Sequence, residues 1–169
     1  MHPKPDLLPA TRDDLPELVG LIRELADYEK LAHLVVIDET RLGQELFGEG
    51  CRAEAMVCRA GGTAVGMAIY SHNFSTFLGR KGLYLEDLFV RPAARSSGVG
   101  SALMSALARI AVQRHYGRFE WSVLDWNEPA LRFYTALGAK PQSEWTVQRL
   151  VNTPLYALAD RWKHPLGKT

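Results

Sequence analysis

The clearest chemical signal in the sequence is a glycine-rich turn before a long helical pattern. The turn reads Arg-Ser-Ser-Gly-Val-Gly-Ser, from Arg95 to Ser101. Glycines let backbone N–H groups converge on an anion, and the positive end of a helix dipole adds to the attraction. Arg95 is placed to add a charge-assisted hydrogen bond. The turn therefore predicts a phosphate site, although a strand-to-helix turn with Arg95 in solvent also fits these residues alone.

Two common phosphate motifs are excluded. A Walker A loop needs Gly-x-x-x-x-Gly-Lys-Ser/Thr, which the chain does not contain. A dinucleotide fingerprint needs a third glycine where Leu103 stands, and this disfavours a nucleotide-binding oxidoreductase. What remains is Arg95-x-x-Gly98-x-Gly100.

Two further groups of residues could move protons. Glu86 and Asp87 are adjacent in the run Gly-Leu-Tyr-Leu-Glu-Asp-Leu-Phe-Val. Because neighbours on a regular strand face opposite sides, only one of the two carboxyl groups is expected to face a given site. Tyr134 follows Phe133 late in a helical segment, where aromatic residues are usually core. A phenol, with an ordinary pKa of about 10, can nevertheless serve as a proton donor.

Composition limits the class of protein. The 169 residues fit one domain, and 47% hydrophobic with 23% charged residues is typical of a globular core. With a net charge of +1, the protein has no strong positive field that would attract nucleic acid or an anionic membrane. Cys51 and Cys58 lack metal-site or redox spacing, so no metal is expected. The start resembles no signal peptide, and no apolar run could cross a membrane, which predicts a cytoplasmic protein.

The elements that must position these residues follow from periodicity and turn signals. Strands are expected at 7–11, 53–58, 63–71, 82–90, 119–124 and 145–151, with a tight hairpin at Gly61-Gly62. Helices are expected after Asp13 or Asp14, over 38–47, 99–114 and 127–137, and from Thr153-Pro154. This order predicts an α/β fold, with a mixed sheet covered by helices on both faces.

The combination of motifs resembles a known family. Arg-x-x-Gly-x-Gly after Phe-Val-Arg-Pro, followed by Trp-Asn-Glu-Pro-Ala-Leu-Arg-Phe-Tyr, is similar to the GNAT superfamily of acetyl-CoA-dependent N-acetyltransferases. Tyr-Leu-Glu-Asp and Asp-Trp-Asn-Glu-Pro resemble its spermidine/spermine branch, which includes diamine and thialysine acetyltransferases. The similarity covers roughly residues 7–160. Relatives often carry glycine directly after the arginine, where this chain has Ser96.

The resemblance implies a GNAT fold with a mostly antiparallel sheet, acetyl-CoA as cosubstrate and a homodimer. It implies Glu86 as the base, acting directly or through water, and Tyr134 as the general acid, while Asp87 is expected to have a structural or dimer role. Cofactor contacts are implied for Leu88, Phe89 and Val90, for Arg95, Ser96, Ser97, Gly98, Val99, Gly100 and Ser101 around the pyrophosphate, and for Asn127, Glu128, Pro129 and Ala130 along the pantetheine arm.

The acceptor is expected to be a small diamine, polyamine or lysine analogue. The segment Asp27-Tyr28-Glu29 matches the family's acceptor loop, and Glu144 falls near a second acidic contact. Tyr28, Glu29, Glu86 and Glu144 are therefore the candidate substrate-binding residues. Two alternatives stay open: acetyl transfer to protein or peptide amines, and a CoA-binding module without catalysis.

Overall fold

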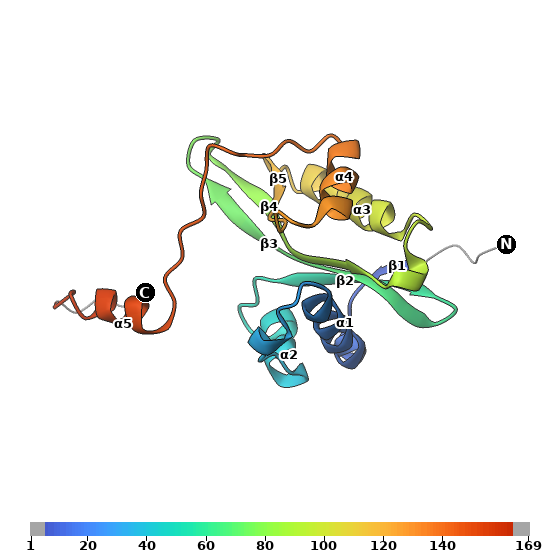
Figure 1. Cartoon of the computed structure of the whole chain (residues 1–169), viewed down its shortest axis with the longest axis horizontal. Helices are drawn as coiled ribbons and strands as arrows, with labels where there is room; N and C mark the ends of the chain where they lie inside the picture. Colours follow the sequence, from blue (N-terminus) through green and yellow to red (C-terminus); the bar gives the residue numbers. More distant parts are fainter. Residues whose placement is uncertain (1–5, 164–169) are drawn as a thin grey trace. The chain divides into compact units, whose positions relative to one another are not determined.

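The computed structural model describes residues 6–163, and the chain divides into two compact units, residues 1–122 and 123–169. The first unit contains the whole sheet, with strand order β1-β2-β3-β4-β5 (Figure 1). The strands are β1 (Asp6–Pro9), β2 (Glu54–Ala60), β3 (Thr63–Ser75), β4 (Arg80–Val90) and β5 (Phe119–Trp121). The first four pair antiparallel, and β5 pairs parallel to β4. The predicted mixed, mostly antiparallel sheet is confirmed.

Helices α1 (Leu15–Tyr28) and α2 (Glu39–Phe47) cover one face of the sheet. Their apolar side chains form the main core with Met67 and Ile69 of β3 and Phe89 of β4. Helix α3 (Val99–Gln113) packs on the opposite face, against β4 and β3, and buries Leu103 and Leu107 completely. A two-faced core of this kind fixes the direction in which each β4 side chain points.

Local sequence signals account for several boundaries. Asp38 caps α2 by accepting a hydrogen bond from the Arg41 backbone N–H at 2.8 Å. Gly61 and Gly62, both with positive φ, form the tight turn between β2 and β3. Short 3-10 turns lie at Arg12–Asp14, Ala32–Leu34 and Pro92–Ala94, the last between β4 and the glycine turn. The predicted helix from Asp38 to Phe47 and the predicted hairpin at Gly61-Gly62 are confirmed within a residue.

The second unit contains helices α4 (Glu128–Ala136) and α5 (Asn152–Ala159). Asn127 is the N-cap of α4, as predicted, and its side-chain oxygen accepts from the Ala130 N–H at 3.4 Å. The strand predicted at 145–151 is wrong, because the backbone there is irregular and pairs with no strand of the described residues. β5 is also shorter than the predicted 119–124 and ends at Trp121.

Candidate active site

A β-bulge in β4 sets the geometry of the site. Tyr70 of β3 lies opposite Leu85, and the preceding residue, Ile69, lies opposite Asp87, so Glu86 is an extra residue in the ladder. Ile69 faces α1, and Asp87 therefore faces α1 as well. Glu86 lies on the same face, because its Oε1 accepts a hydrogen bond from the Ser71 hydroxyl at 3.2 Å. The expectation that only one of the two carboxyl groups can face a site is wrong.

Three carboxyl groups from two elements meet on this face. Glu29 follows the last turn of α1, while Glu86 and Asp87 lie side by side on β4. Burial, together with the charges of Glu29 and Glu86, raises the pKa of Asp87 to about 6. Burial also raises the pKa of Glu29. The structure thus brings two candidate substrate residues, Glu29 and Glu86, around a third acid.

Hydrogen bonds attach the end of α1 to this part of the sheet. Arg91, directly after β4, contacts Glu24 of α1 at 2.7 Å and donates to the Ala64 carbonyl of β3 at 2.7 Å. The guanidinium group is planar and holds both partners in fixed directions. The last turn of α1, with Tyr28, is thereby fixed relative to β4.

The backbone of β4 has an unpaired edge where the family resemblance expects the thioester. β5 pairs with β4 only along Leu83–Leu85. From Glu86 to Val90, no strand of the described residues pairs with that edge of β4. Unpaired backbone N–H groups are the donors that an acyl oxygen requires. The expected contacts of Leu88, Phe89 and Val90 with acetyl-CoA fit this geometry.

The glycine turn has the backbone shape of an anion site. Gly98 is the N-cap of α3 with φ of +88°, and a Cβ built on it would meet nothing within 4 Å. The N-cap residue, Gly98, gives the first N–H groups of α3 no side-chain cap. Val99, Gly100 and Ser101 form the first turn of that helix, and the Ser97 hydroxyl donates to the Ala94 carbonyl at 2.7 Å. The turn fits a pyrophosphate group.

Ser96 takes a left-handed conformation with φ of +60°. Glycine enters that region without the clash that a Cβ creates. The serine retains the backbone shape at a conformational cost of roughly 1 kcal/mol. Ser96 therefore holds this turn in a conformation that costs energy for a residue with a Cβ.

Arg95 is exposed, but its guanidinium group contacts two aromatic rings and a backbone carbonyl. Its guanidinium carbon lies 4.8 Å from the centre of the Tyr28 ring and 5.9 Å from that of Phe89. Its Nε donates to the Val90 carbonyl at 3.0 Å. Arg95 therefore links the glycine turn to the end of β4 and to the candidate acceptor segment.

The remaining predicted site residues belong to the second unit. Asn127, Glu128, Pro129 and Ala130 form the N-terminus of α4, and Tyr134 lies two turns further on, with its ring 5.2 Å from that of Phe133. Glu144 is exposed in the irregular segment after α4. A convergence of Tyr134 or Glu144 with the carboxyl groups of β4 stays a prediction.

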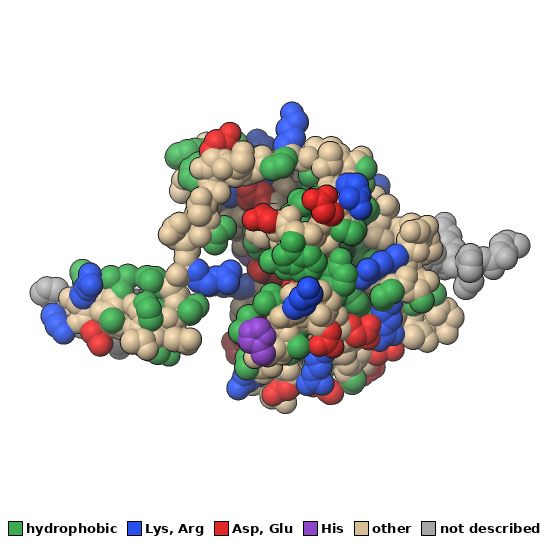
Figure 2. Space-filling view, in the orientation of Figure 1, with side chains coloured by type: hydrophobic (Ala, Val, Ile, Leu, Met, Phe, Trp, Pro, Cys, Tyr) green, Lys and Arg blue, Asp and Glu red, His purple; other side chains and the backbone are tan. Residues whose placement is uncertain are grey.

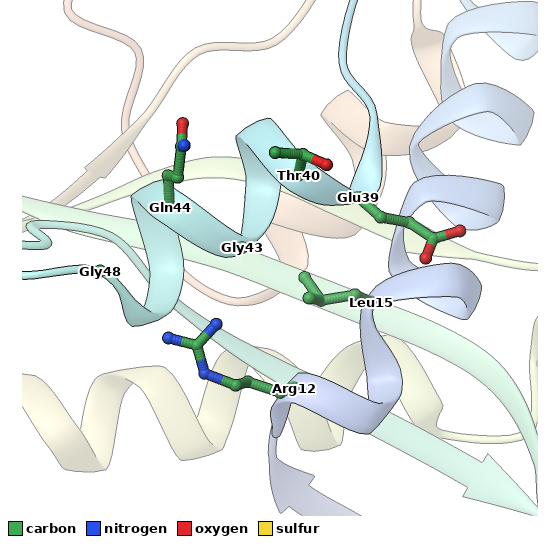
Figure 3. Close-up of a pocket in the computed structure, with 7 residues that line it drawn as sticks. All are labelled: Arg12, Leu15, Glu39, Thr40, Gly43, Gln44 and Gly48. Carbon is green, nitrogen blue, oxygen red and sulfur yellow. The ribbon is translucent and has the colours of Figure 1, made fainter.

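A separate pocket lies in the first unit, among the described residues. An open pocket of about 380 Å³ lies between α2 and the start of α1, lined by Arg12, Leu15, Glu39, Thr40, Gly43, Gln44 and Gly48 (Figure 3). None of the candidate residues lines it. Acidic and basic side chains are interspersed over the face seen in Figure 2. Among residues 6–163, no three His, Cys, Asp or Glu side chains are arranged to hold a metal ion, and no helix could span a membrane.

Comparisons with known proteins identify the class of protein to which this fold belongs. Residues 21–139 match the acetyltransferase (GNAT) family, and the chain belongs to that family. It is 34% identical over 163 residues to the thialysine N-epsilon-acetyltransferase of Mus musculus, an alignment covering 90% of this chain and 95% of the relative. It is 28% identical to the L-ornithine N5-acetyltransferase of Arabidopsis thaliana, covering 88% and 85%.

A solved structure has a similar fold. An integron cassette protein from the mobile metagenome of V. cholerae superimposes with a TM-score of 0.77 and 27% identity, covering 92% of this chain and 97% of that one. The chain is thus an acetyltransferase with the GNAT fold, as its sequence predicted. GNAT acetyltransferases use acetyl-CoA as the acetyl donor.

Asp87 is the site residue whose environment sequence reasoning missed. A signal was present, because the residues that face α3 are Leu83 and Leu85 and then Leu88 and Val90. The interval of three between Leu85 and Leu88 breaks the two-residue period of a strand and indicates one extra residue.

Proposed function

We propose that the enzyme transfers acetyl from acetyl-CoA to the terminal amine of a small acceptor with a second charged end. The acceptor class is a diamine, a polyamine or a lysine analogue such as thialysine or ornithine. The observation that carries this proposal is the group of carboxyl side chains from α1 and β4 on one face of the sheet. Carboxylates attract a cationic amine and select against neutral acceptors.

The names of the two relatives support the same acceptor class. Thialysine and ornithine each carry a side-chain amine at one end and an α-amino acid group at the other. An acceptor of this shape could use Glu29 and Glu86 at the reacting amine and Glu144 at a further contact. The two charged ends explain why more than one acidic residue would be needed.

In this proposal the turn from Ser96 to Ser101 holds the pyrophosphate, with Arg95 beside it. The backbone of Leu88, Phe89 and Val90 meets the thioester and the pantetheine amides, and Asn127 to Ala130 line the pantetheine arm. Glu86 takes part in removing the proton of the amine, and Tyr134 protonates the departing thiolate.

The homodimer and the cytoplasmic location expected from the sequence are also part of the proposal. Large exposed apolar side chains of the second unit, before, in and after α5, support a dimer. These are Trp145, Val147, Leu150, Val151, Leu155, Tyr156, Leu158 and Trp162. A second copy of the chain would remove such a surface from water.

The test is an acceptor panel with acetyl-CoA, measured by thiol release. Thialysine, ornithine, putrescine, spermidine, a monoamine of matched length and a lysine peptide are compared by kcat/KM. Acceptors with two charged ends should exceed the monoamine by roughly tenfold for each extra contact. The preference should shrink at high salt. A peptide as the best acceptor would favour the protein-acetylating alternative, and no turnover with any amine would favour a CoA-binding module.

A further inference from the structure

We infer that Asp87 takes the proton from the acceptor's ammonium group and that Glu86 passes this proton to solvent. The inference rests on the proposed amine acetyltransferase function and divides the work of proton removal between the two residues. In the step, an N–H bond of the ammonium breaks and an O–H bond forms on the Asp87 carboxylate. The electron pair stays on nitrogen, which becomes the nucleophile for the thioester.

The bulge provides the geometry for this division. Both side chains lie on the α1 face, although they are consecutive in the chain, because the extra residue cancels the usual alternation. Asp87 pairs with Ile69 and lies at the edge of the apolar core, while Glu86 is exposed. Asp87 is therefore half-buried, whereas its neighbour Glu86 is exposed to water.

Position along β4 puts Asp87 next to the expected reaction centre. It directly precedes the segment Leu88–Val90, whose edge towards β5 lacks a strand partner among the described residues. An amine between Asp87 and the thioester would thus lie beside the carboxyl group and beside the backbone donors. The Ser71 hydroxyl donates to Glu86 Oε1 at 3.2 Å and holds Glu86 on the same face as Asp87.

The charges of the groups around Asp87 also favour its role as a base. Glu29 comes from the end of α1 and Glu86 from β4, while β3 contributes the uncharged Ile69 and Ser71. The cation of Arg95 lies over the rings of Tyr28 and Phe89. With burial, the two negative neighbours bring the pKa of Asp87 to about 6, near the pH at which a base has to work.

The experiment is a pH profile of kcat/KM for the full-length enzyme with saturating acetyl-CoA. A base must be deprotonated, so activity of the wild type should rise with pH through about 6. Thialysine and putrescine are both used, because a rise that belongs to the enzyme has the same midpoint for both. Asp87→Asn should remove this rise and lower kcat by about 10²–10⁴-fold.

Two further variants distinguish a proton acceptor from a structural residue. Glu29→Gln removes one negative neighbour, so the midpoint should move to lower pH while the rise persists. Glu86→Gln should move it in the same direction and also lower kcat. Asp13→Asn, at an exposed carboxyl group on the first 3-10 turn, is the matched control and should leave the profile unchanged.

Each outcome bears on the inference. A rise that persists unchanged in Asp87→Asn overturns it, as does a midpoint that does not move in Glu29→Gln. If the wild type acetylates none of the amines, the proposed function fails instead. Thermal unfolding of Asp87→Asn confirms that a loss of activity comes from a folded enzyme.

Discussion

The guanidinium group of Arg95 lies over the ring of Tyr28, 4.8 Å from its centre. This contact joins the turn expected to hold the pyrophosphate to the segment expected to hold the acceptor. The same guanidinium donates to the Val90 carbonyl, at the end of the strand expected to hold the thioester. One side chain thus links the three parts of the proposed site, and a change in one is expected to affect the others.

Arg95→Ala should therefore weaken acetyl-CoA binding and also raise KM for the amine. A cation–π contact at a partly exposed position contributes about 0.5–1 kcal/mol. A double-mutant cycle with Tyr28→Leu, measured on the amine KM, should give a coupling energy of this size. Additive effects of the two substitutions would mean that the contact does not connect the two sites.

Ser96→Gly should stabilise the enzyme, because it removes a Cβ from a residue with φ of +60°. The gain is expected to be about 1 kcal/mol or slightly less, since glycine also gains freedom in the unfolded chain. Ser97→Gly is the adjacent control and should destabilise, because it loses a hydrogen bond to the Ala94 carbonyl. Urea unfolding of the two variants measures this opposite effect.

Tyr134→Phe should leave acetyl-CoA binding intact and lower kcat by about 10²–10⁴-fold. The ring and its packing against Phe133 are retained, while the proton for the thiolate is lost. Calorimetric titration with CoA and steady-state kinetics separate the two effects. Tyr116→Phe removes a hydroxyl in the first unit and serves as the control. Full activity of Tyr134→Phe would assign the residue to packing alone.

Asp87→Asn should make the protein more stable at pH 8. The folded-state pKa is about 6 against an ordinary value of 3.8, so the native state binds more protons between these values. Stability of the wild type therefore falls as pH rises through that window. The variant should gain up to about 3 kcal/mol at pH 8 and little at pH 3.5. Denaturant unfolding at both values checks this, and a constant difference would contradict the assigned pKa.

Such a gain would agree with a catalytic purpose for the buried acid. Such a carboxyl group destabilises the folded protein when it is charged. It is retained where its chemistry is needed. The stability measurement and the pH profile of activity are independent, so each can contradict the role of Asp87 separately.

Much of the first unit was predictable because its boundaries depend on nearby residues. Asp38 caps α2 through the N–H three positions later, and the pair Gly61-Gly62 supplies the two positive φ angles of a hairpin. Neither feature needs a distant partner. The family resemblance added the sheet type and the cofactor turn.

Two features were less accessible to sequence reasoning. The segment 145–151 has the apolar pattern of a strand, but a strand exists only where another backbone pairs with it, and none of the described residues does. The bulge at Glu86 was missed for a related reason. Whether residues 86 and 87 share a face depends on the register with β3, which the pair Glu-Asp does not reveal by itself.

The bulge also determines where the length of β4 can change. Leu85 is paired with Tyr70 and Asp87 with Ile69, and only Glu86 is outside the ladder. In a chain without Glu86, every other residue of β4 would keep its partner on β3. Each of their side chains would stay on the same face of the sheet. Loss of a residue elsewhere in the strand would move the side chains on one side of the gap to the opposite face of the sheet. This would expose Phe89 or bury a charge. Glu86 therefore marks the one place in β4 where related chains can differ by a single-residue gap and still fold alike.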